Sequence, residues 1–102
     1  MNTKNQTQDR QQVLIDLYMQ YLLNEITLGQ LLAYLRKNIL GMSQEQYANL
    51  VGVSRRTLTD IEQDKGKLTQ SVLDKVFKPL GLKAGLVPPH EHIVRKIIKP
   101  SE

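Results

Sequence analysis

The 102-residue sequence predicts a single, all-α domain. Apolar residues recur at the i, i+3 and i+4 spacing of amphipathic helices in several consecutive segments. Most of these segments begin directly after a Ser or Thr, the residue types that cap helix N-termini, and Gly or Pro follows several of them. The length suits one compact domain, and a hydrophobic content of 40% is sufficient for a modest core.

The first helix is expected over about residues 10–24, before the main group of helices. Residues 1–9 are rich in Asn, Gln and Thr and have little to bury, so we expect them to be disordered. Thr27 is the expected N-cap of the next helix, about Leu28–Asn38, and Gly41 closes that segment. The apolar stripe of the first helix comprises Val13, Leu14, Leu17, Tyr18, Tyr21 and Leu22.

Residues 43–62 predict two short helices joined by a tight turn. Ser43 is the expected cap of the first helix, and Gln46 completes a capping box with it. Gly52 suits a left-handed turn, and Ser54 is placed to cap the second helix. This is the layout of a helix-turn-helix, in which the second helix enters the DNA major groove.

The outer face of that second helix provides the candidate DNA contacts. Burying Leu58 and Ile61 leaves the opposite face free. The candidate base-reading residues are Arg55, Arg56 and Asp60. Arginine can bond to guanine O6 and N7 with two hydrogen bonds, whereas Asp60 can either accept from cytosine N4 or orient Arg56. The residues expected to contact phosphate or support the base readers are Gln44, Ser54, Thr57 and Thr59.

The C-terminal fifth of the chain is expected to differ from the helical part. Thr69 is placed to cap a helix over about residues 70–78, and Pro79 disfavours its continuation. We therefore expect a DNA-binding domain over residues 10–82, followed by a short strand and a basic tail over 83–102. The strand itself is expected at Leu82–Val87, and the tail after it could be a second strand, a short helix or a disordered arm.

Several functional classes find no support in the sequence. There is no cysteine, no Gly-rich phosphate loop and no acid–base constellation, so we expect no enzyme, no catalytic residue and no cofactor. His90 and His92 have metal-ligand spacing but no evident third ligand, so no metal is expected. The N-terminus has no apolar signal region and no apolar run approaches the length of a membrane span, which predicts a cytoplasmic protein.

At the motif the sequence resembles the Xre/Cro/phage-repressor family of helix-turn-helix regulators. The matching residues are Ser43, Gln44, Glu45, Ala48, Gly52, Val53, Ser54, Leu58, Ile61 and Glu62. The resemblance implies a five-helix, lambda-repressor-like bundle over residues 28–82. It assigns base reading to Arg55, Arg56 and Asp60, and phosphate contact to Gln44, Ser54 and Thr57. It also implies an ion pair between Arg36 and Glu62. The chain is one residue longer than the family pattern before Gly41, which makes Lys37 the alternative partner and places the extra residue near Ile39–Leu40.

The arrangement of a helix-turn-helix followed by an apolar strand is similar to HipB-type antitoxins. That resemblance implies a homodimer paired through the strand, a palindromic double-stranded DNA operator, autoregulatory repression and a HipA-like kinase toxin as partner. A stand-alone phage-type repressor is an alternative. A protein-interaction module without specific DNA binding is another alternative, because residues 43–67 have no net charge. The four basic residues of this segment are Arg55, Arg56, Lys65 and Lys67, and the four acidic residues are Glu45, Asp60, Glu62 and Asp64.

Overall fold

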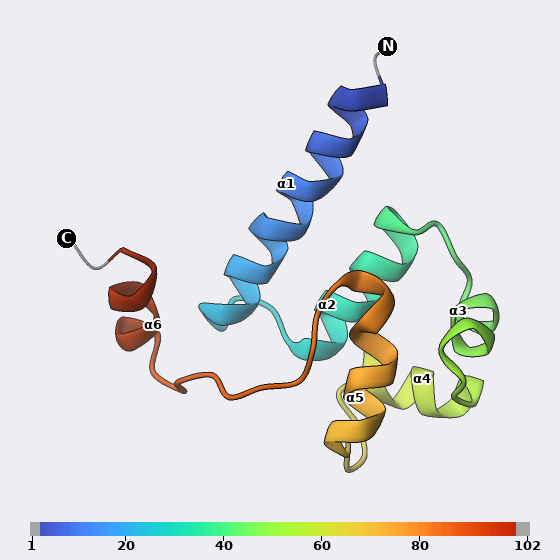
Figure 1. Cartoon of the computed structure of the whole chain (residues 1–102). Helices are drawn as coiled ribbons and strands as arrows, with labels where there is room; N and C mark the ends of the chain where they lie inside the picture. The colour runs from blue at the N-terminus through green and yellow to red at the C-terminus, as the bar shows by residue number, and fades with distance from the viewer. Residues whose placement is uncertain (1–2, 100–102) are drawn as a thin grey trace. The chain divides into compact units, whose positions relative to one another are not determined.

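The computed structural model describes residues 3–99, with side chains described from residue 9 onward. The helices, coloured along the chain in Figure 1, are α1 (Thr3–Leu22), α2 (Leu28–Tyr34), α3 (Gln44–Val51), α4 (Arg55–Glu62), α5 (Gln70–Phe77) and α6 (Glu91–Ile98). A π-helical turn, η1 (Leu35–Ile39), continues α2, and a 3₁₀ turn, η2 (Lys78–Leu80), continues α5. The chain divides into two compact units: unit 1 contains α1 and α6, and unit 2 spans Thr27–Gly85.

The helices of unit 2 begin at the residues that the sequence predicts as caps. In α2, α3, α4 and α5 the side chain of the N-cap residue accepts a hydrogen bond from the backbone N–H three positions later, which satisfies one orphan donor of each helix. These caps are Thr27, Ser43, Ser54 and Thr69. Gly52 ends α3 in the left-handed conformation, at φ 75° and ψ 35°, as its position between two helices predicts.

The core of unit 2 is formed by side chains from α2, η1, α3, α4 and α5. Its largest fully buried members are Tyr47, Leu31, Leu32, Leu35, Leu58, Ile61 and Val76. α4 packs against both α2 and α3, so the helix with the candidate DNA-contacting face has its other face held by two neighbours. The position of α4 is therefore determined by hydrophobic burial.

The extra residue before Gly41 lies within the helix rather than in the turn that follows it. The backbone N–H of Leu40 donates to the carbonyl of Leu35 at 3.1 Å, a five-residue step typical of a π-helix. The sequence predicts the insertion near Ile39–Leu40, whereas η1 distributes it over Leu35–Ile39. A π turn absorbs one residue by widening the helix locally, and therefore leaves the residues before it in register.

Unit 1 differs from the sequence-based expectation at the start of its first helix, and its C-terminal tail matches one of the alternatives that the sequence leaves open. α1 begins at Thr3, ahead of the predicted start near residue 10, and the disorder of residues 1–9 stays a prediction. The tail forms the helix α6, one of the three alternatives that the sequence leaves open. α1 lies in unit 1, and the turn at Leu23–Ile26 follows it along the chain. That helix 10–24 belongs to the DNA-binding domain stays a prediction.

The strand predicted at Leu82–Val87 is not seen, and no strand occurs between residues 3 and 99. A strand requires a hydrogen-bonded neighbour, and no described segment provides one. The backbone N–H of Ala84 instead donates to the Asp74 carboxylate at 2.8 Å. None of the helices in the described part of the chain is long and apolar enough to cross a membrane.

Candidate nucleic-acid interface

The turn between α3 and α4 sets the geometry of the candidate interface. Gly52 and Val53 both donate their backbone N–H to the carbonyl of Ala48, at 3.0 and 3.1 Å, which closes α3 tightly. Ala48 is buried, and a small side chain there permits the close approach of the two helices. α4 then begins at Arg55, directly after the N-cap Ser54, and Figure 1 shows the short connection between the two helices.

The face of α4 opposite its buried side chains is accessible. Leu58 and Ile61 are fully buried, whereas Arg55 and Arg56 are exposed and Asp60 is partly exposed. Within residues 9–99 the ion pairs join Arg36 to Glu62 and Arg95 to Glu91, so Asp60 and Arg56 are not ion-paired with each other. The three candidate base readers are therefore not engaged with one another.

The first turns of α3 and α4 present backbone donors. At α3, Ser43 Oγ accepts from the N–H of Gln46, and the carbonyl of Ser43 accepts from the N–H of Tyr47. At α4, Ser54 caps the N–H of Thr57 in the same way. The backbone N–H groups of residues 44 and 45 in α3, and of residues 55 and 56 in α4, have no hydrogen-bond partner among the described residues. Free N–H groups at a helix start point along the helix axis, a geometry suited to phosphate.

The hydroxyl groups at the start of α4 are partly used within the protein. Ser54 Oγ accepts from the Thr57 N–H at 3.0 Å and donates to Thr57 Oγ1 at 2.9 Å. Because Thr57 Oγ1 serves as the acceptor in the second bond, its own proton remains available to an external acceptor. Of the two residues, Thr57 is therefore the better placed donor to a phosphate oxygen.

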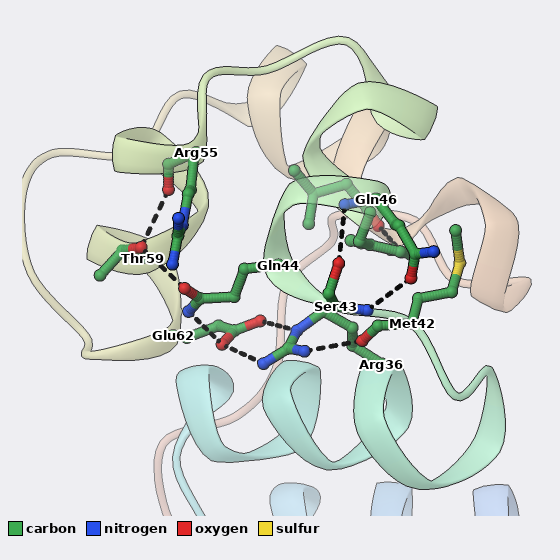
Figure 2. A network of polar contacts seen from close by, with 10 residues as sticks. Arg36, Met42, Ser43, Gln44, Gln46, Arg55, Thr59 and Glu62 are labelled. Atoms are coloured by element: carbon green, nitrogen blue, oxygen red, sulfur yellow. Dashed lines mark hydrogen bonds and ion pairs between the residues drawn. The ribbon is translucent and has the colours of Figure 1, made fainter.

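Behind the accessible face lies a buried ion pair, shown in Figure 2. Arg36 donates from Nε to Glu62 Oε2 at 2.6 Å and from Nη2 to Glu62 Oε1 at 2.9 Å, and the two side chains are 4% and 6% exposed. Arg36 Nη1 also donates to the Met42 carbonyl at 2.8 Å. Arg36, at the start of η1, rather than the exposed Lys37, thus links the end of α4 to the chain just before α3.

Gln44 extends this buried pair toward the start of α4. Its Nε2 donates to Glu62 Oε1 at 3.0 Å, and its Oε1 accepts from Thr59 Oγ1 at 3.3 Å (Figure 2). Thr59 Oγ1 also donates to the carbonyl of Arg55 at 2.9 Å, so its one proton is shared between the two acceptors. The amide of Gln44 is therefore held by two residues of α4 and retains one N–H for an external acceptor.

The environment of Glu62 lowers its pKa below the ordinary value. Burial acts to raise the pKa, but hydrogen bonds from Arg36 and Gln44 and the positive charges of Arg36 and Lys37 outweigh it. The carboxylate is therefore ionised at neutral pH and balances the Arg36 guanidinium. Glu62 thus stabilises the structure without adding an uncompensated negative charge near the candidate DNA contacts.

Tyr47 ties α3 to α5 through its hydroxyl. The side chain is fully buried, and its O–H donates to the Val76 carbonyl at 2.5 Å, which satisfies the hydroxyl inside the core. Burial, together with the negative charge of Glu62, raises the pKa of Tyr47 to about 12. The hydroxyl therefore stays protonated and able to donate across the physiological pH range.

Two residues that position α4 are not identified by the sequence-based reasoning. Gly29 is buried where α2 meets the end of α4, and a Cβ there would lie 2.4 Å from the Glu62 carbonyl oxygen. Asp64 follows α4 in the left-handed region, at φ 57°, and accepts from the Gly29 N–H and the Thr27 hydroxyl at 2.9 and 2.6 Å. Gly29 lies in the first turn of a helix that the sequence predicts, and a glycine at such a position can indicate a close approach of another backbone segment.

The histidine pair in the C-terminal segment lies outside this interface, in unit 1. The rings of His90 and His92 have centroids 5.7 Å apart. Within the described residues no group of three or more His, Cys, Asp or Glu side chains is placed to hold a metal ion.

Comparison with known proteins agrees with this geometry. A family model described as Helix-turn-helix matches residues 32–87, which include α3 and α4 entirely. No curated protein and no solved structure gives a significant match. Since the family model covers more than half of the chain, the protein belongs to the Xre-type helix-turn-helix family of DNA-binding regulators.

Proposed function

We propose that this protein is a sequence-specific transcriptional repressor that places α4 in the major groove of double-stranded DNA. The observation that carries the proposal is the contrast between the two faces of α4. One face is held by a buried core and the Arg36–Glu62 pair, while Arg55 and Arg56 are exposed on the other. Rigid support behind accessible arginines is what direct readout of base edges requires.

The proposed contacts divide into base readers and phosphate binders. Arg55 and Arg56 would donate to base edges, and Asp60, which is not paired with Arg56, would accept from cytosine N4. The remaining donors of Gln44 and Thr57 would bind phosphate, together with the helix start at Ser54, and Thr59 would hold Gln44 in position. Phosphate contacts would set the register of α4, and the base readers would set its preference.

A homodimer on a palindromic operator is the proposed functional form. Leu86 and Val87 end the segment predicted as a strand, and they are 104% and 37% exposed. Pairing of Leu82–Val87 with the same segment of a second copy would supply the missing hydrogen-bonded neighbour. Two copies of α4 would then meet half-sites about one helical turn, or ~10 base pairs, apart.

The test is a selection of bound duplexes from a random-sequence DNA library, followed by titration of the enriched sequence at two salt concentrations. We expect a palindrome to be enriched, and we expect Arg55→Ala to weaken specific binding by roughly 1–3 kcal/mol while relaxing the preference at one position of each half-site. Arg10→Ala, which removes an exposed arginine of α1, is the matched control and should leave the preference unchanged.

A second variant distinguishes the effect of phosphate contacts from the effect of base contacts. Thr57→Val removes a neutral donor and should weaken binding to all sequences about equally, without changing the salt dependence. If no sequence is enriched and Arg55→Ala has no effect on DNA binding, the repressor proposal is wrong. The protein-interaction module, which the neutral charge of residues 43–67 favours, would then be preferred.

We also propose that the protein represses its own gene and acts as an antitoxin. Both roles are supported by the order of a helix-turn-helix followed by the exposed apolar residues Leu86 and Val87. An autoregulating antitoxin should bind DNA upstream of its own gene, and the neighbouring gene should encode a HipA-like kinase that co-purifies with it. Binding upstream without such a neighbour would instead support a stand-alone phage-type repressor.

A further inference from the structure

A cavity of about 410 Å³ lies within unit 1, between the last part of α1 and α6. Its lining residues are Met19, Leu23, Arg95, Lys96, Ile98 and Lys99. A volume of this size is in the range of small-molecule sites. None of these residues belongs to the proposed DNA contacts, so the cavity needs an explanation of its own.

The floor of the cavity is apolar and adaptable. Met19 and Leu23 lie one helical turn apart, with the Leu23 N–H donating to the Met19 carbonyl at 3.0 Å, and Ile98 of α6 completes the set. All three side chains are part-buried. Methionine follows the shape of an apolar ligand easily because its side chain is unbranched and polarizable.

The rim of the cavity is positively charged. Arg95 is paired with Glu91, but no carboxylate of residues 9–99 lies within ion-pairing distance of Lys96 or Lys99. These two lysines are exposed: Lys96 lies in the last turn of α6, and Lys99 is the C-cap residue that follows it. Both line the same cavity, so their ammonium groups can converge on one anionic group. Their aliphatic stems extend the apolar wall while the charged ends remain at the surface.

We propose that this cavity binds a small amphiphilic carboxylate. Its aliphatic chain would lie on Met19, Leu23 and Ile98, and its carboxylate would lie between Lys96 and Lys99. A second copy of the chain is a poorer occupant, because a two-fold contact centred here would bring the lysines of both copies together. The inference goes beyond the proposed DNA binding, and its test does not depend on it.

The test uses the full-length protein with ¹³C-labelled methionine methyl groups, titrated with decanoate below the concentration at which it forms micelles. We expect the Met19 methyl signal to shift and saturate. Met42, in unit 2, is an internal reference whose signal should not move. Equal, unsaturated shifts at both methionines would indicate general amphiphile binding and would overturn the proposal.

The role of the lysines is tested with paired variants. Lys96→Ala/Lys99→Ala should raise the dissociation constant of decanoate roughly tenfold, and the uncharged decanol should bind the original protein weakly. Alanine maintains helix propensity, so α6 should persist. Lys75→Ala/Lys78→Ala, two exposed lysines with the same spacing at the end of α5, is the matched control and should leave the affinity unchanged. Equal affinity in the two double variants would refute the proposed site.

Discussion

The two units of this protein each contain an arginine–glutamate pair, and the pairs differ in almost every physical respect. In unit 2, Arg36 uses two nitrogens to bind the two oxygens of Glu62, and both side chains are almost fully buried. In unit 1, Arg95 directs two nitrogens to a single oxygen of Glu91, and the side chains are 57% and 48% exposed. The same chemistry is a structural link in one place and a solvated surface pair in the other.

The difference between the pairs follows the difference between the units. Unit 2 contains all of the largest fully buried side chains, whereas the buried apolar residues described in unit 1 are Leu17 and Val94. A dense core excludes water, so the loss of one partner of a buried ion pair leaves the other charge uncompensated and costs much stability. A unit with little core leaves its ion pair in water, where screening makes it weak.

Removing the arginine of each pair should give the largest contrast. Arg36→Met leaves Glu62 buried without its countercharge, so we expect the free energy of unfolding to fall by about 3–5 kcal/mol. Arg95→Met, the matched change in unit 1, should lower it by less than about 1 kcal/mol. Urea unfolding followed by circular dichroism measures both, and similar losses in the two variants would contradict the comparison.

A glycine substitution tests the close packing that distinguishes unit 2. Gly29→Ala would place a Cβ against the carbonyl groups of Ile61 and Glu62, so we expect a loss of about 1–3 kcal/mol in unfolding free energy. Gly85→Ala is the control, because a Cβ there meets nothing within 4 Å. Thermal unfolding should separate the two variants clearly, and a neutral Gly29→Ala would mean that α2 and α4 can move apart without loss.

The buried pair should also make stability depend on pH. The pKa of Glu62 is lower in the folded state than its ordinary value of 4.5, so the unfolded chain takes up the proton more readily. The stabilisation is present above pH 4.5 and is lost as the pH falls through the folded-state pKa. Unfolding free energies measured from pH 7 downward should therefore decline more steeply in the original protein than in Glu62→Gln. Parallel curves would exclude Glu62 as a source of the acid sensitivity.

The smallest effects are expected on the exposed side of α6. Ile97→Ser replaces a side chain that is 64% exposed, so amide hydrogen exchange in α6 should change by less than about twofold. Val94→Ala removes methyl groups from a buried side chain and should accelerate exchange there roughly five- to tenfold. A large effect of Ile97→Ser would show that this face is covered, for example by the second copy of a dimer.

Much of unit 2 could be predicted from the sequence because its signals are local. The side chains of Thr27, Ser43, Ser54 and Thr69 cap the N–H groups three residues later, and Gly52 alone suits the left-handed end of α3. The periodicity of the apolar residues likewise identified the buried face of α4 and, with it, the exposed face that contains Arg55 and Arg56. Each of these features depends only on residues within one or two helical turns of it, so the neighbouring sequence is sufficient to predict it.

Tertiary structure decided what depends on distant residues. The extra residue before Gly41 is accommodated in the π turn η1, and Arg36 of that turn pairs with Glu62, 26 positions away. Gly29 and Asp64 acquire their roles only where α2 meets the end of α4. The segment Leu82–Val87 has strand-like composition, but a strand forms only with a hydrogen-bonded neighbour, and no strand occurs in the described chain. The backbone N–H of Ala84 donates to the Asp74 carboxylate instead. Local sequence specifies helices and their caps, whereas long-range hydrogen bonds and close contacts can be assigned only once the helices are packed.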